Sequence, residues 1–228
     1  MIVIKNSKLR QVLKILIPFV IIPAVAVSGV LLFDEKKHLI VSFAIAIFSL
    51  LLFFTGFEKK VTGTRRMVLV AIMTAISVLG RFIPFFKPIT AITVITAMYL
   101  GSEAGFLVGS LSALISNFYF GQGPWTAFQM LSWGLIGWIA GVLANRLKMS
   151  RVFLYLYGVL SGIAFSLIMD VWTVLWYNAG FDTELYLASI TTAIPHTILY
   201  AVSNVIFLYF LAKPFGEKLE RIKIKYGV

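Results

Sequence analysis

Long apolar runs constrain the fold of this chain more than any other feature of its sequence. Eight such runs are separated by short stretches that carry charge, glycine or proline. They cover residues 15–33, 39–57, 67–86, 89–100, 104–120, 125–144, 152–177 and 187–212. A helix that crosses a bilayer needs about 20 mostly apolar residues. The runs therefore predict an all-α polytopic membrane protein.

The overall composition supports this fold class. Apolar residues make up 60% of the chain and charged residues 13%, whereas a soluble domain carries roughly 25% charged residues. The mean hydropathy is +0.96. These values exclude a soluble enzyme, a disordered chain and a small secreted scaffold. The sequence contains no cysteine, which excludes disulfides and thiol catalysis.

The positions of the basic residues predict the orientation in the membrane. With a cytoplasmic N-terminus and alternating spans, only Lys36, Lys37, Arg81 and Lys87 fall outside, and the other sixteen of the 20 basic residues face the cytoplasm. This is a strong positive-inside bias, and it predicts that both termini are cytoplasmic. The net charge of +11 then reflects topology and contact with the lipid bilayer, and we predict no binding to nucleic acid.

A charged link at residues 58–66 divides the chain. We predict an accessory pair of transmembrane helices at 1–63 and a six-helix membrane module at 64–228. Two points stay open at this stage. The run 89–100 is short, so it is a tilted or re-entrant helix or continues into the next run. The tripeptide Ala24-Val25-Ala26 resembles a signal-peptidase site, so cleavage near residue 26 is an alternative to a first span.

Motifs for catalysis are absent from the sequence. It has no Walker loop, no His-Glu-x-x-His and no Gly-x-Ser-x-Gly. The chain therefore does not hydrolyse ATP itself, and we predict no enzyme activity and no cofactor. Its two histidines, His38 and His196, lie in different regions, so we predict no metal site.

Small residues recur at four-residue spacing in three places. Gly101, Gly105 and Gly109 form one row, and Gly137 with Gly141 forms another. Such rows let helices approach closely in lipid, so we expect the glycine rows to pack inside the module. The pair Ala71 and Ala75 lies in the cytoplasmic half of its helix, where a smooth surface suits a docking partner.

Polar and aromatic residues gather at one depth, in the outer third of the predicted bundle. Polar groups inside a membrane are costly and tend to be functional, and aromatics with a few polar anchors are typical of a small-molecule pocket. The predicted substrate-binding residues are Arg81, Asn117, Gln122, Trp125, Gln129, Asp170, Trp172, Trp176 and His196. Structural roles are the alternative: a bridge from Asp170 to Arg81 or His196, and an interfacial belt for the tryptophans.

From about Arg65 onward the sequence resembles the substrate-binding S components of energy-coupling factor (ECF) transporters. The resemblance rests on the basic start of the first module helix, on Ala71-Ile-Met-Thr-Ala75, on the six-segment length, and on the stretch 121–141, which begins Gly-Gln-Gly-Pro-Trp. It implies a six-helix binder of vitamins in a prokaryotic plasma membrane, with an outward-facing pocket. It also implies docking through Ala71 and Ala75 on a transmembrane coupling subunit that works with two ATPase subunits. The extra N-terminal pair departs from the family pattern.

The substrate and the mode of energy coupling are left with alternatives. The Gly-Gln-Gly-Pro-Trp stretch resembles a cobalamin or corrinoid group of S components, and amides such as Asn117, Gln122 and Gln129 suit a ligand fringed with carboxamides. Riboflavin, folate and queuosine precursors are the alternative substrates. A proton-coupled secondary transporter, or a membrane enzyme, that uses Asp170 and His196 is the alternative function.

Overall fold

The computed structural model describes residues 6–32, 37–56 and 60–227, and this part of the chain is almost entirely helical. Lys5, Lys36 and Lys59, which enter the charge distribution above, lie outside the described residues. The elements are α1 (Ser7–Leu16), the π-helical turn η1 (Ile17–Ile21), α2 (Ile22–Leu32), α3 (His38–Thr55), α4 (Lys60–Gly80), α5 (Ile89–Leu100), α6 (Ser102–Phe120), α7 (Trp125–Val142), α8 (Ala144–Met149), α9 (Arg151–Asn178) and α10 (Thr183–Tyr226).

These helices confirm the all-α polytopic fold class. Within the described residues, five stretches are long and apolar enough to cross a membrane: Ser7–Leu32, His38–Thr55, Gly63–Gly80, Arg151–Asn178 and Thr183–Tyr226. Helices α6 and α7 are not among these five and lie at the centre of the bundle. Their polar residues face protein rather than lipid.

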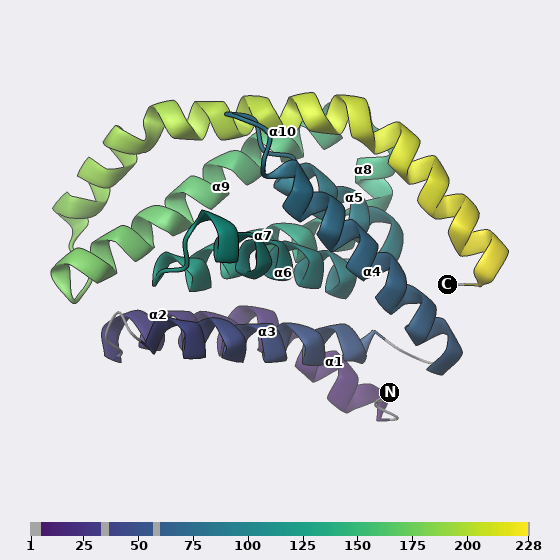
Figure 1. Ribbon diagram of the computed structural model, residues 1–228, viewed down its shortest axis with the longest axis horizontal. Helices are drawn as coiled ribbons and strands as arrows, with labels where there is room; N and C mark the ends of the chain where they lie inside the picture. The colour runs from purple at the N-terminus through teal and green to yellow at the C-terminus, as the bar shows by residue number, and fades with distance from the viewer. Residues whose placement is uncertain (1–5, 33–36, 57–59, 228) are drawn as a thin grey trace.

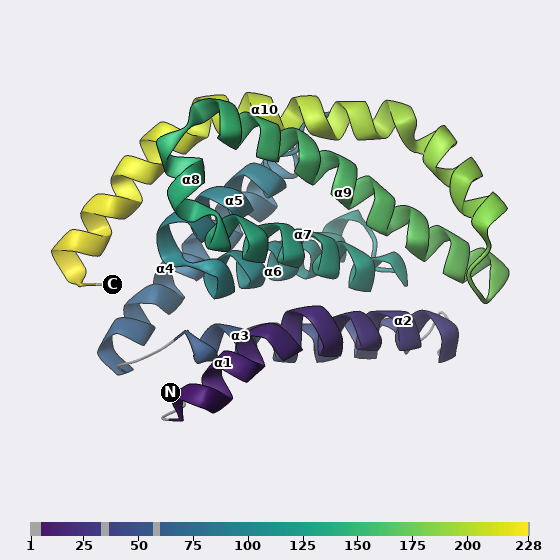
Figure 2. The same cartoon turned by 180° about the vertical axis from the view of Figure 1, so that it is seen from behind.

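The helices form three layers, which Figures 1 and 2 show from opposite sides. Helices α1, α2 and α3 make the layer drawn lowest in both views, α6 and α7 lie above it, and α9 with α10 covers the far side. Helix α4 crosses the bundle obliquely and packs on α5 and α6. The central pair α6–α7 makes the most extensive helix–helix contact among the described elements. Helices α3, α4, α5 and α9 pack against this pair.

Glycine rows allow α6 and α7 to pack this closely, as the sequence predicts. A Cβ atom added at Gly109 would lie 2.5 Å from the carbonyl oxygen of Trp133. A Cβ at Gly137 would lie 2.5 Å from the carbonyl oxygen of Gly105. Both obstacles are backbone atoms, which cannot turn aside as a side chain can. Any larger residue at these two positions has to push the helices apart.

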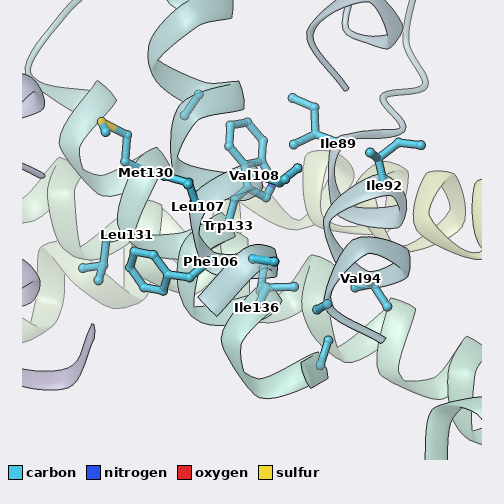
Figure 3. Packing of buried hydrophobic residues seen from close by; sticks show 14 of the residues in the cluster. Ile89, Ile92, Val94, Phe106, Leu107, Val108, Met130, Leu131, Trp133 and Ile136 are labelled. Atoms are coloured by element: carbon cyan, nitrogen blue, oxygen red, sulfur yellow. The ribbon is translucent and has the colours of Figure 1, made fainter. Parts of the chain in front are cut away.

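Helix α5 is an interior helix, which settles the open question about residues 89–100. It has 12 residues, about 18 Å at about 1.5 Å per residue, and all of them except Tyr99 are buried. It does not continue into α6, because Gly101 breaks the helix with φ +97°, a conformation that favours glycine. Figure 3 shows Ile89, Ile92 and Val94 of α5 in one apolar cluster with residues of α6 and α7.

Helix α10 extends well beyond the predicted run 187–212. It has 44 residues, about 66 Å of helix, and it arches over the bundle in Figure 1. Pro195 and Pro214 lie inside it, and interior prolines bend helices because each removes a backbone hydrogen bond. The apolar run predicted the membrane part of α10, whereas the final turns are polar and basic.

An ion pair and aromatic packing join the N-terminal layer to the module. The Lys14 ammonium lies 2.5 Å from the carboxylate of Glu103, which is in the first turn of α6 and is only 7% exposed. Phe19 meets Trp138 of α7 edge to face, with ring centroids 4.9 Å apart. Ala26, next to the possible cleavage site, is fully buried in α2.

Candidate functional site

A network of polar side chains joins the start of the link 81–88 to α6 and α7. The Arg81 guanidinium donates hydrogen bonds to Ser116 Oγ at 2.6 Å and to Asn117 Oδ1 at 2.5 Å. The Asn117 amide donates in turn to Thr126 Oγ1 and to Gln129 Oε1, both at 2.8 Å. Asn117 is 1% exposed, so its amide is satisfied by protein groups alone. We call these five residues, with Gln122, the polar network.

Gln122 closes the polar network at the turn between α6 and α7. Its Oε1 accepts a hydrogen bond from Thr126 Oγ1 at 3.1 Å, and its amide donates to the Leu114 carbonyl at 2.8 Å. Thr126 Oγ1 also accepts from the backbone N–H of Gly123 at 3.3 Å. The glycines and proline of this turn therefore serve the site by holding Gln122 and Thr126 in reach of Asn117.

The link 81–88 is fastened to the middle of α10. Ser203 Oγ accepts a hydrogen bond from the Lys87 backbone N–H at 2.9 Å and donates to the Lys87 carbonyl at 3.2 Å. The Lys87 ammonium donates to the carbonyl of Arg81 at 2.7 Å. Burial, and then the charge of Arg81, lowers the pKa of Lys87. Two cations thus lie together at the rim of the interior, which favours a ligand with electronegative atoms.

Three aromatic rings from three helices lie next to these cations. Trp133 of α7 stacks on Phe165 of α9, with centroids 4.7 Å apart and planes 23° apart. Phe165 meets Tyr200 of α10 edge to face at 5.1 Å. The Arg81 guanidinium lies 5.7 Å from the Trp133 ring centroid, within the range of a cation–π interaction. We call Trp133, Phe165 and Tyr200 the aromatic trio.

A small cavity opens between the aromatic trio and the link 81–88. Its volume is about 10 Å³, about that of one water probe. Besides the trio, its lining includes Lys87, Thr90, Gly162 and Asn204. Asn204 is 2% exposed and donates to the Gly158 carbonyl at 2.9 Å. Helices α9 and α10 are close here, because a Cβ at Gly162 would lie 2.7 Å from the Ala201 nitrogen.

The structure brings together some of the sequence-predicted site residues. Arg81, Asn117, Gln122 and Gln129 are all members of the polar network. Trp125 and Trp172 touch edge to face, with ring centroids 5.9 Å apart. Trp176, four residues after Trp172 in α9, packs against the apolar core.

Unlike these residues, Asp170 and His196 make no hydrogen bond, ion pair or ring contact with the rest of the predicted site within the part of the chain that the structure describes. Asp170 is 8% exposed in α9, and its Oδ2 has no hydrogen-bond partner. His196 lies on an exposed face of α10. Among the described residues, no ion pair or hydrogen bond joins Asp170 to His196 or to Arg81, whose donors go to Ser116 and Asn117. The structural bridge considered for Asp170 is therefore not formed, and the acid–base pair of the alternative functions is not assembled.

Ala71 and Ala75 lie on the exposed side of α4. Both are exposed, as are Val68, Ile72 and Leu79, at helical spacing along the same helix. The opposite side of α4 buries Leu69, Val70 and Met73. The exposed side is smooth and apolar, as expected of a surface that meets either lipid or another membrane helix.

Sequence reasoning missed five residues around the cavity: Lys87, Trp133, Phe165, Tyr200 and Asn204. Two of these residues could have been found from the sequence. Lys87 is a cation on the outer side, which is poor in cations, and Asn204 is a polar amide inside a membrane span. The aromatic trio carried no such signal, because an aromatic residue in an apolar run is equally consistent with a lipid-facing position.

Comparison with known proteins identifies the family. The model of the family described as ECF-type riboflavin transporter, S component, matches residues 61–216, more than half of the chain. The chain belongs to this family. As an S component it is a membrane-embedded substrate-binding subunit of an ECF transporter, and it is a multi-pass membrane protein. No curated protein and no solved structure matches the chain.

The part of the chain that matches the S-component family contains the candidate site. Residues 61–216 contain α5 to α9, nearly all of α4 and most of α10, whose last ten residues lie beyond the match. The polar network, the aromatic trio and the small cavity all lie within this range. The N-terminal layer of α1 to α3 lies before it.

Proposed function

We propose that this S component binds riboflavin or another flat heteroaromatic vitamin at the aromatic trio and serves an ATP-driven importer. The observation that carries the proposal is the meeting of Trp133, Phe165 and Tyr200 with Arg81 and Lys87. Aromatic rings offer faces and edges to a flat heterocycle. The positive charge of Arg81 and Lys87 beside the rings attracts the electronegative carbonyls and ring nitrogens of such a ligand. The family description supports the same class of ligand.

Substrate entry requires the aromatic trio to open. In the conformation described here the rings pack on one another and leave about 10 Å³, far below the roughly 300 Å³ or more of a typical ligand pocket. Helices α9 and α10 supply Phe165 and Tyr200, and α10 contacts the link 81–88 through Ser203. We propose that an outward displacement of these two helices admits the vitamin between α7 and α9.

Cobalamin, the substrate that the sequence suggested first, stays a prediction. The amides on which it rests, in Asn117, Gln122 and Gln129, are engaged with one another and with Thr126 and the Leu114 carbonyl. A ligand that used them would have to break this network. A ligand held by the aromatic trio would not, and this difference favours the smaller flat vitamin.

Energy for uptake is proposed to come from partner subunits. The sequence lacks a Walker loop, so the partners in this proposal are a transmembrane coupling subunit and two ATPases, in a prokaryotic plasma membrane with both termini cytoplasmic. The exposed side of α4 around Ala71 and Ala75 is the proposed contact with the coupling subunit. Small side chains there allow the backbones of two membrane helices to approach closely.

A binding titration tests the substrate proposal. Riboflavin fluorescence is measured as purified protein in detergent is added, for the wild type and for Phe165→Leu. Loss of one aromatic contact costs about 0.5–1.5 kcal/mol beyond the lost area. We expect the dissociation constant to rise about two- to twelvefold, at 1.4 kcal/mol for a factor of ten.

A matched control separates loss of the site from loss of packing. Phe128→Leu removes another buried ring, one that is 2% exposed on α7 and outside the aromatic trio. We expect its dissociation constant to equal that of the wild type. Equal affinity of Phe165→Leu and wild type would refute the assignment of the site, as would an equal loss in both variants.

A further inference from the structure

A second, polar cavity lies away from the aromatic trio, where several helix ends meet. Its volume is about 340 Å³, within the usual range of ligand sites. The residues that give it its chemistry are Arg66, Tyr99, Gly101, Asn145, Lys148 and Lys223. They come from α4, the α5–α6 junction, α8 and the last part of α10. The charge distribution assigns this end of the bundle to the cytoplasm.

Three cations line this cavity, and no carboxylate does. Arg66 is held in place by hydrogen bonds to the backbone carbonyls of Gly56, at 3.0 Å, and Leu100. The Lys148 ammonium lies 4.2 Å from the ring centroid of Tyr99. Among the described residues, the ammonium groups of Lys148 and Lys223 have no ion pair and no hydrogen bond. The cavity therefore presents the positive charge of Lys148 and Lys223, which no ion pair among the described residues neutralises.

Two further features strengthen the positive potential. Gly101 lines the cavity immediately before α6 begins at Ser102, and the N-terminal end of a helix attracts anions. The acid in the first turn of α6, Glu103, is already paired with Lys14. Burial lowers the pKa of Lys148, Glu220 raises it, and the nearby charge of Lys223 lowers it. A bound anion would relieve the repulsion between the two lysines.

Exposed apolar residues close in sequence to the cavity lining indicate which anion fits. Val142 directly follows the lining residue Gly141, Met149 directly follows Lys148 at the end of α8, and Val152 lies in the first turn of α9. The three are 60%, 87% and 77% exposed. In a membrane protein such residues face acyl chains. A phosphate group can come from a lipid or from solution, and an apolar border next to a cationic cavity matches a molecule that has both a phosphate and acyl chains.

We infer that this cavity binds the phosphate headgroup of an anionic phospholipid of the cytoplasmic leaflet. Lys148 and Lys223 contact the phosphate, and Arg66 and Asn145 border it. The acyl chains lie along Val142, Met149 and Val152. The inference does not depend on the identity of the vitamin, because the cavity shares no lining residue with the cavity at the aromatic trio.

Native mass spectrometry with added phosphatidylglycerol tests the inference. The full-length protein in detergent is titrated, and the fraction that retains one lipid gives an apparent dissociation constant. Basic residues near a membrane surface contribute about fivefold each to anionic lipid binding. We expect Lys148→Gln/Lys223→Gln to weaken binding roughly thirtyfold. We also expect phosphatidylglycerol to bind the wild type more tightly than zwitterionic phosphatidylcholine.

The control variant Arg146→Gln/Lys218→Gln removes the same charge from the same two helices but spares the cavity lining. It should bind phosphatidylglycerol as the wild type does. Equal weakening in both double variants, or equal binding of the two lipids, would overturn the inference. Inorganic phosphate forms the third arm, and if it binds as tightly as the lipid, the assignment to a lipid is wrong. The single variant Lys148→Gln, expected to lose about fivefold, provides the test if the double variant does not fold.

Discussion

Replacing Gly109 with alanine adds one methyl group to a close contact between α6 and α7. The new Cβ would lie 2.5 Å from the Trp133 carbonyl oxygen and 2.6 Å from its carbonyl carbon. A carbon normally lies about 3.3–3.6 Å from a carbonyl oxygen, so α6 and α7 have to separate by about 0.8–1.1 Å. A gap of that size forfeits roughly a quarter to a half of the dispersion energy of the contacts it opens.

The net effect on stability follows from two opposing contributions. Overpacking a tight interior costs about 1–3 kcal/mol, and replacing a helical glycine with alanine returns up to about 1 kcal/mol. We expect a net loss of about 1–2 kcal/mol, which lowers Tm by roughly 2–8 °C in a protein of this size. The Asn117–Gln129 hydrogen bond, 2.8 Å across the same helix pair, should weaken as well.

Thermal unfolding in detergent, followed by tryptophan fluorescence, measures this effect. Gly180→Ala is the matched control, because the closest atom to its added Cβ is the Asn178 carbonyl oxygen at 4.0 Å. We expect this control to melt within about 2 °C of the wild type, since surface substitutions stay within about ±0.5 kcal/mol. If Gly109→Ala melts at or above the wild-type temperature, α6 and α7 do not pack through this row.

Three further substitutions test other parts of the account. Ala71→Trp/Ala75→Trp should prevent co-purification with a coupling subunit while riboflavin affinity stays unchanged; recovery of the full complex would exclude this surface as the contact. Lys14→Met should destabilise the protein by about 1–3 kcal/mol, because the buried Glu103 carboxylate loses its ion-pair partner Lys14. The double variant Lys14→Met/Glu103→Gln should recover part of this loss. If all three proteins melt at the same temperature, the ion pair does not anchor the N-terminal layer. Asp170→Asn should raise Tm, because a buried charge without a partner is costly; a lower Tm would show that the carboxylate has a structural partner. If the carboxylate accepts a hydrogen bond from the ligand, the same variant should also bind the ligand ten- to a hundredfold more weakly.

Much of the fold could be predicted from the sequence, because length and hydropathy largely determine what spans a bilayer. The run 89–100 shows the limit of that reasoning. Its 12 residues were too few to cross the membrane, and whether it joined the next helix depended on the backbone at Gly101. The extent of α10 beyond residue 212 was missed for a related reason, since a polar, basic helix that leaves the membrane has no hydropathy signal.

The sequence predicted which polar residues lie near one another better than it predicted which side chains face the interior, and this difference has a physical cause. The position of a residue along a span gives its depth, so Arg81, Asn117 and Gln129 were correctly expected to lie near one another. The direction in which a side chain points depends on how each helix is rotated within the bundle. His196 shares that depth but faces outward, whereas Phe165 and Tyr200 face Trp133, and only the packing of α7, α9 and α10 distinguishes these cases.

The central claim is that the natural ligand is a flat heteroaromatic vitamin held by Trp133, Phe165 and Tyr200. The most direct measurement starts from protein purified from cells that supply many vitamins. The protein is denatured, and the absorption spectrum and mass of the released small molecule are measured. The account predicts one equivalent of riboflavin or a related flat heterocycle from the wild type, and much less from Phe165→Leu. Release of a corrinoid, or equal release from both proteins, would contradict it.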